Sequence, residues 1–172
     1  MQWSSTRPLR FSALAGAVSL IWLAVSAAGR AAGPPIPAEF AVIASSGVPV
    51  DDLTFDELRR VFLFRRSVWR PNQPVNVILP DSGLPARGFL LRHIYRMSDQ
   101  DLRRFILERI FQAEIDFAPK AVGSDAEAMA FARAGRSIVA VVSAGATLLP
   151  DVKVLRIDGK LPREAGYPLV DR

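Results

Sequence analysis

The chain has 172 residues, of which half are apolar, with a net charge of +5, a single histidine and no cysteine. This length and composition are sufficient for one hydrophobic core. The missing cysteine excludes disulfides and, together with the single histidine, most zinc, haem and iron–sulfur sites. We therefore expect a domain that is stabilised by packing alone and carries no metal and no cofactor.

Residues 1–32 have the plan of a secretory signal peptide. Arg7 and Arg10 form a positive start, Phe11–Ala27 is uncharged and mostly apolar, and small residues suited to cleavage follow. The apolar run is shorter than the roughly 20 residues that a membrane-spanning helix needs. We predict a cleaved signal and a periplasmic location, with an uncleaved membrane anchor as the alternative.

The segment after the signal divides into a spacer and a domain. Residues 33–38 contain three prolines, which fix the backbone and predict a stiff extended spacer. Residues 39–172 remain for the folded domain. Its arginines are mostly interspersed with acids, which indicates solvated helix faces and no nucleic-acid partner. One basic cluster leaves open a phosphate or an acidic partner: Arg59, Arg60, Arg65, Arg66 and Arg70.

The first half of the domain predicts a strand, a helix and a second strand. The apolar run Phe40–Ala44 predicts a buried strand. Thr54–Phe64 opens with a threonine–glutamate capping box and continues with apolar residues at helical spacing, so we expect an amphipathic helix. A loop with a turn at Arg70–Pro74 then leads into the strand Val75–Leu79.

The second half alternates helices and strands. The predicted elements are a helix from Leu84 to about Met97, a helix capped at Ser98, an irregular segment over Ala113–Val122, a helix that opens with the capping box Ser124–Glu127 and stops before Gly135, a central strand at Ser137–Val142 and a half-exposed edge strand at Val152–Ile157. This alternation indicates an α/β fold, a three-layer mixed sheet with helices on both faces.

The candidate binding site is the tight turn between the strand Val75–Leu79 and the next helix. A helix start leaves backbone N–H groups unpaired and carries the positive end of the helix dipole, so an anion fits there. Ser82 adds a hydroxyl donor, and Gly83 permits close approach to the backbone. The predicted ligand-binding residues are Asp81, Ser82, Gly83, Leu84 and Arg87, the last as a countercharge.

The sequence does not favour catalysis. It has no Ser/His/Asp order, no metal-ligand spacing and no phosphate loop of the P-loop type. Ser82 has no evident base, and His93 has the setting of a partly exposed helix residue. We therefore expect a protein that is not an enzyme.

Four segments carry a resemblance to the phosphate-binding proteins of phosphate ABC transporters, and to type 2 periplasmic binding proteins more generally. Leu53–Ile78 is similar to that family's helix, corner, tryptophan, turn and strand, and Asp81–Phe89 to its Ser-Gly-Thr turn and helix. Ala121–Val142 resembles the segment that ends in a Gly-Ala-Ile-Gly-Tyr-Val strand. Val152–Arg172 resembles the Ile-Asp-Gly-Lys-x-Pro…Tyr-Pro-Leu stretch, which is the most specific match.

The resemblance implies one lobe of a type 2 periplasmic binding protein, with phosphate or a related oxyanion as ligand and an ABC transporter permease or another envelope protein as partner. The chain departs from the family pattern at several positions. Phe64 replaces a corner glycine, Leu84 a threonine and Val139-Ala140 the Ile-Gly-Tyr core, and Pro80 lies near the position where the family has a phosphate-binding arginine. The chain also provides one lobe where the family has two.

A single lobe implies weak anion binding, because an exposed turn leaves the anion hydrated and screened. The alternative is a binding-impaired lobe that serves as an envelope protein-interaction or sensing module. Self-association is related to this alternative, since two copies could supply the missing half of the cleft.

Overall fold

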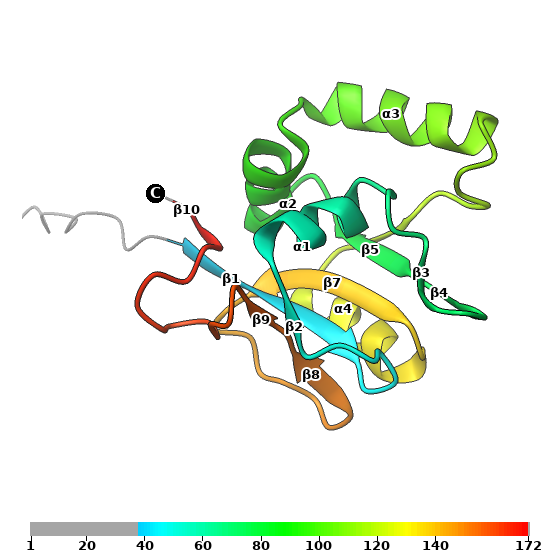
Figure 1. Cartoon of the computed structure of the whole chain (residues 1–172). Coiled ribbons are helices and arrows are strands. Elements are labelled where there is room, and N and C mark those ends of the chain that lie inside the picture. The colour runs from blue at the N-terminus through cyan, green and yellow to red at the C-terminus, as the bar shows by residue number, and fades with distance from the viewer. Residues whose placement is uncertain (1–37, 172) are drawn as a thin grey trace, which may run out of the picture. The chain divides into compact units, whose positions relative to one another are not determined.

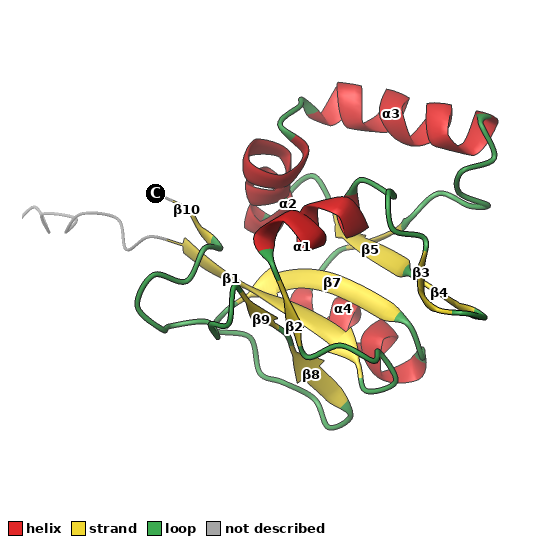
Figure 2. Cartoon of the chain, in the orientation of Figure 1, coloured by secondary structure: helices red, strands yellow, loops and turns green. Residues whose placement is uncertain are grey.

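The computed structural model describes residues 38–171, so the predicted signal peptide and nearly all of the spacer lie outside the described residues. Figure 2 shows the helices and strands of the described part. The strands are β1 (Ala38–Ser45), β2 (Asp52–Leu53), β3 (Val68–Arg70), β4 (Gln73–Pro74), β5 (Asn76–Pro80), β6 (Lys120–Val122), β7 (Ile138–Ser143), β8 (Val152–Val154), β9 (Arg156–Ile157) and β10 (Val170–Asp171). The helices are α1 (Phe55–Phe62), α2 (Pro85–Phe89), the π-helix η1 (Leu90–Tyr95), α3 (Asp99–Phe111) and α4 (Asp125–Ala134).

The main sheet is mixed, as the sequence predicted. Its strands lie in the order β10-β1-β7-β5-β6, and β8 also pairs with β1. β1 runs antiparallel to β7, β8 and β10, whereas β5 runs parallel to both β6 and β7. The carboxyl ends of β5, β6 and β7 therefore meet at one edge of the sheet, and the candidate turn follows β5 at that edge.

Helices cover both faces of this sheet, which confirms the predicted three-layer fold. Figure 1 shows α1 and α2 on one side of the sheet and α4 on the other. Alternate residues of β1 enter two separate hydrophobic clusters: Phe40 and Val42 pack with α1, α2 and η1, whereas Ala41 and Ile43 pack with α4. The side-chain period of two in a strand explains this division, because neighbours point to opposite faces.

Two predicted helix starts have the expected caps. At α1, the Glu57 amide donates to Thr54 Oγ1 at 3.2 Å and the Thr54 amide donates to Glu57 Oε2 at 2.9 Å, which completes the capping box. At α3, the Asp101 amide donates to Ser98 Oγ at 3.1 Å. Within residues 38–171, no helix combines the length and apolar character that a membrane crossing requires.

Three predicted elements differ from the structure. The expected helix Leu84–Met97 is a single α-helical turn that continues as the π-helix η1 and ends at Tyr95. The segment Ala113–Val122 is not wholly irregular, because its last three residues form the edge strand β6. The expected strand Val152–Ile157 is two strands, since β8 pairs with β1 while β9 pairs with β2. Short strands pair through the backbone alone and leave little hydrophobic pattern to detect.

Phe64 shows how the chain departs from glycine at a corner. Its backbone φ is 59°, in the left-handed region that favours glycine. The Phe64 ring stacks on Phe105 of α3 with ring centroids 6.2 Å apart. A phenylalanine at this corner is therefore less favourable for the backbone than glycine, but its ring gains a contact with α3.

Candidate anion-binding corner

The candidate turn lies open at the carboxyl end of β5. Asp81, Ser82 and Gly83 are exposed, and a Cβ atom added at Gly83 would meet nothing within 4 Å. The Asp81 amide donates to Val122 O at 2.9 Å, and the Leu84 amide donates to Asp81 O at 3.0 Å. Within the described part of the chain, the amides of Ser82 and Gly83 have no acceptor. Two backbone donors thus face outward from this corner.

Arg87 lies beneath the turn and is buried, with 7% of its surface exposed. Its guanidinium forms a fork on one carboxylate oxygen, with Nε at 2.8 Å and Nη2 at 2.7 Å from Asp99 Oδ1. Nη1 donates to Pro80 O at 3.4 Å. The guanidinium therefore lies against the end of β5. Pro80 at that end lies near the position where the family that the sequence resembles has a phosphate-binding arginine.

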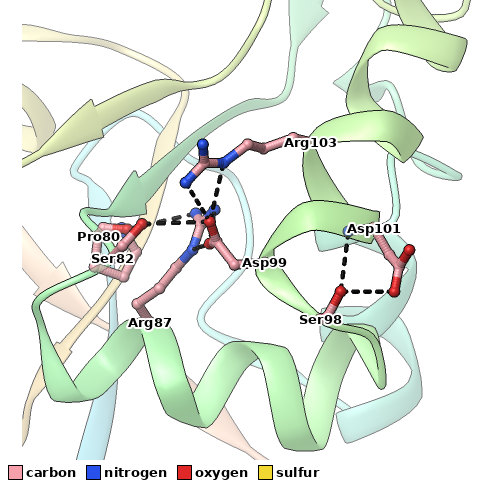
Figure 3. Close-up of polar contacts among 7 residues, drawn as sticks. All are labelled: Pro80, Ser82, Arg87, Ser98, Asp99, Asp101 and Arg103. Carbon is pink, nitrogen blue, oxygen red and sulfur yellow. Dashed lines mark hydrogen bonds and ion pairs between the residues drawn. The ribbon is translucent and has the colours of Figure 1, made fainter.

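Asp99 is the common acceptor of this cluster. Arg103 donates to Asp99 Oδ2 through Nε at 3.0 Å and Nη2 at 2.6 Å, and Ser82 Oγ lies 3.4 Å from the same oxygen. The hydrogen bond from Arg87 is the main cause that lowers the pKa of Asp99, and Arg103 adds to it. Figure 3 shows this carboxylate between the two guanidinium groups, with Ser82 at its side.

The start of α3 holds Asp99 in this position. Ser98 caps the helix and accepts the Asp101 amide, and its own hydroxyl donates to Asp101 Oδ2 at 2.6 Å (Figure 3). Asp99 is the first residue of α3. The cap thus fixes the backbone at Asp99, and its carboxylate lies between two arginines while 26% of the side chain stays exposed.

The neighbouring helix start, that of α4, is occupied by its own side chains. The Glu127 amide donates to Ser124 Oγ at 3.1 Å, and Glu127 Oε2 accepts the Gly123 amide at 2.9 Å. The expected capping box is thus wrong in one half, because Glu127 reaches the residue before the cap. Asp125 Oδ2 accepts the Ser143 amide at 3.2 Å. The start of α4 therefore carries two carboxylates that accept amides of the chain, whereas no carboxylate among residues 38–171 accepts the amides of the Ser82 turn.

The structure brings the predicted site residues together, yet it adds two that the sequence analysis missed. Asp81, Ser82, Gly83 and Leu84 form the turn, and Arg87 lies directly beneath it. Asp99 and Arg103 complete the cluster from α3. Asp99 was interpreted as part of a helix start, and no local signal showed that it would meet a residue twelve positions earlier.

A separate cavity of about 450 Å³ lies at the amino end of β5. Its lining comes from the strand β5, from the loop 114–119 and from side chains that include Phe64, Phe131 and Arg136. None of the predicted site residues lines it. A second hollow of about 270 Å³ is lined by Arg59, Arg60 and Arg65 of the predicted arginine cluster, together with Asp56 and Leu63.

Comparisons with known proteins give structural matches only. No protein-family model matches the chain, and no curated protein matches it in sequence. A putative phosphate ABC transporter substrate-binding protein with bound phosphate from Clostridium perfringens matches with a TM-score of 0.59 and 14% identity, over 78% of this chain and 53% of that one.

Two further solved structures match with similar scores. An ABC-type phosphate transport receptor from Vibrio cholerae matches with a TM-score of 0.57 and 13% identity, over 73% of this chain and 49% of that one. PstS from Borrelia burgdorferi matches with a TM-score of 0.59 and 13% identity, over 80% and 56% respectively. The chain therefore has the fold of these binding proteins, and the match spans about half of their length.

Proposed function

We propose that this chain is an extracytoplasmic solute-binding-like domain that binds phosphate or a related oxyanion at the Ser82–Arg87 corner. The observation that carries this proposal is the open turn after β5, where two unpaired amides lie above a buried arginine. Backbone N–H groups and arginine are the donors that oxyanions prefer. We further propose a periplasmic location and an ABC transporter permease or another envelope protein as partner.

The fold shared with the three neighbours supports this proposal, since two of them are named as phosphate transport proteins. The exposure of the turn limits the affinity. Hydrogen bonds to an anion are strongest in a dry site, whereas water and salt weaken them at a surface. We therefore expect weak binding in a single copy of the chain, with a dissociation constant in the millimolar range, about 1 mM or above.

Titration of ¹⁵N-labelled protein with sodium phosphate tests the proposal, with sodium chloride at equal ionic strength as control. The expected result is a saturable shift of the Ser82 and Gly83 amides and of the Arg87 Nε–H signal. The β3–β4 hairpin lies at the amino end of β5, opposite the corner (Figure 1), and its amides provide the internal reference. Signals at the corner that stay unchanged at millimolar phosphate would refute the proposal.

A second function is favoured by one observation, the occupation of Arg87 by Asp99. A lobe whose cation is already paired fits an interaction or sensing module that no longer depends on an anion. Co-purification of the tagged chain from envelope extracts, with and without phosphate, separates the two. A partner retained equally in both conditions supports the interaction module, and one retained only with phosphate supports the solute-binding domain.

A further inference from the structure

The Asp99 carboxylate occupies the place that an external anion would need. It accepts from Arg87 on one oxygen and from Arg103 on the other, and the Ser82 hydroxyl lies 3.4 Å away. We propose that Asp99 is an internal ligand of this corner, so that an oxyanion binds only by displacing the Asp99 carboxylate and loosening the first turn of α3. This inference rests on the proposed function and adds its regulation.

Burial of Arg87 makes the two events exclusive. The side chain is 7% exposed, and its Nε and Nη2 atoms already form a fork on Asp99 while Nη1 is directed to Pro80 O. A buried guanidinium requires an anionic partner, because it has no water to replace one. An arriving oxyanion therefore exchanges with Asp99 and does not add to it.

The same exchange reaches α3 because Asp99 is its first residue. Among the residues of α3, only Leu102 is buried. Phe105 and Ile106 pack partly buried against the core further along the helix, and the ion-pair cluster is the polar attachment of the first turn to the α2 corner. Release of Asp99 therefore frees the first turn of α3 together with Arg103, which follows the carboxylate at i+4. Binding of an oxyanion at the corner therefore increases the mobility of the first turn of α3.

The ligand class follows from the donors. Arg87, Arg103 and the Ser82 hydroxyl surround one carboxylate, which has only two oxygens. A tetrahedral dianion such as phosphate has more oxygens and twice the charge, so it can engage both arginines and the amides of the turn together. We therefore expect a dianionic oxyanion to displace Asp99 more readily than a monocarboxylate does.

The test is a phosphate titration of three proteins: wild type, Asp99→Asn and Asp101→Asn. Each is expressed from the full-length sequence and purified in the form that the host cell produces. Asparagine keeps the size of Asp99 and an oxygen for Arg87 while removing the charge. Asp101 lies in the same helical turn, where it accepts the Ser98 hydroxyl and forms an exposed pair with Arg104, and it forms no hydrogen bond or ion pair with Arg87 or Arg103, so it is the matched control. Binding is read from the Ser82 and Gly83 amides and from the rise in melting temperature with phosphate.

We expect Asp99→Asn to bind phosphate about tenfold or more tightly than wild type, because phosphate then no longer has to displace a carboxylate from the two arginines. Asp101→Asn should bind like wild type. Equal affinity in wild type and Asp99→Asn would overturn the internal ligand and leave the proposed function standing. Binding by Asp99→Asn alone would support the internal ligand and refute phosphate binding as the native function. Absence of binding in all three would overturn both.

A second measurement keeps the inference testable if Asp99→Asn fails to fold. Hydrogen exchange of the wild type, with and without saturating phosphate, reports the first turn of α3 directly. We expect phosphate to accelerate exchange at residues 102 and 103 while the amides at the middle of α4 stay unchanged. Unchanged or slower exchange at the start of α3 in the phosphate complex would overturn the inference. Acetate at the same ionic strength should produce a smaller effect.

Discussion

The helices α1 and α3 begin with the same chemistry but are held by different forces. Each has a hydroxyl cap that accepts the amide three residues later. In α1, Leu58, Val61 and Phe62 are completely buried, whereas Leu102 is the one buried residue of α3. α1 is thus held by apolar burial along its length, whereas α3 combines Leu102 and the partly buried Phe105 and Ile106 with polar contacts near its start.

The difference shows which part of the molecule can respond to a ligand. Apolar burial is non-directional and is lost only when the helix leaves the core. A charge pair is directional, and another ion can replace one partner. The outer face of α3 also exposes two apolar side chains, Leu107 at 54% and Phe111 at 87%. The predictions below test whether the two helices differ in this way.

The largest expected effect concerns the apolar face of α1. Phe62→Ala removes a completely buried ring and should reduce the free energy of unfolding by about 3–5 kcal/mol, because the cavity cannot fully close. Phe111→Ala on α3 is the matched control and should change it by no more than about 0.5 kcal/mol. Urea unfolding measures both. A large loss at Phe111 would show that α3 is packed as firmly as α1.

The polar contacts of α3 come next. Arg87→Met removes both hydrogen bonds to Asp99 Oδ1 and should reduce the free energy of unfolding by about 2–3 kcal/mol. Arg104→Met is the control, since Arg104 is exposed and lies 3.7 Å from Asp101 in a surface pair. Its loss should be about 0–1 kcal/mol. Equal losses in the two variants would indicate that Arg87 does not stabilise α3 more than a surface arginine does.

Acid should weaken the attachment of α3. The hydrogen bond from Arg87 lowers the pKa of Asp99 from the ordinary value of 3.8. A carboxyl group whose pKa is lower in the folded state stabilises the fold above its unfolded pKa, and this contribution disappears as the pH falls through the lower folded value. Urea unfolding of wild type and Arg87→Met should therefore give curves that converge as the pH falls below about 4.

Other carboxyl groups contribute to the acid response of the whole chain. The pKa values of Asp51, Glu57 and Asp171 are also lowered, so the wild type alone does not report on Asp99. The difference between wild type and Arg87→Met isolates the Asp99 contribution. A difference that stays constant down to the acid limit would contradict the assignment.

The smallest effect concerns the end of α3. Ala113 has a backbone φ of 55° just after this helix, in the region that glycine adopts without strain. Ala113→Gly should therefore raise the free energy of unfolding by about 0.5–1 kcal/mol. Ala130→Gly in the exposed part of α4 should lower it by about 0.5–1 kcal/mol, because glycine weakens a helix interior. Thermal unfolding compares the two, and shifts of the same sign would contradict the argument.

Local signals predicted most of the fold. The capping box at Thr54, the apolar spacing after it and the β-prone run near Val139 gave α1 and the central strand β7, because caps and periodicity act within a few residues. The sequence analysis did not predict the strands β6 and β10, because each is only two or three residues long and is defined by the strand with which it pairs. It did not predict η1 either, because six residues are too few for the periodicity of a π-helix to be distinguished from that of an α-helix.

For the candidate site, the sequence by itself determined the turn. A strand that ends in a small polar segment and leads into a helix start places Ser82 and Gly83 at an exposed corner, with Arg87 one turn further on. Only the tertiary structure decided what Arg87 does, because Asp99 reaches it from a different helix. The packing of that helix against the corner depends on contacts between segments that no local pattern encodes, and it placed the Asp99 carboxylate between Arg87 and Arg103.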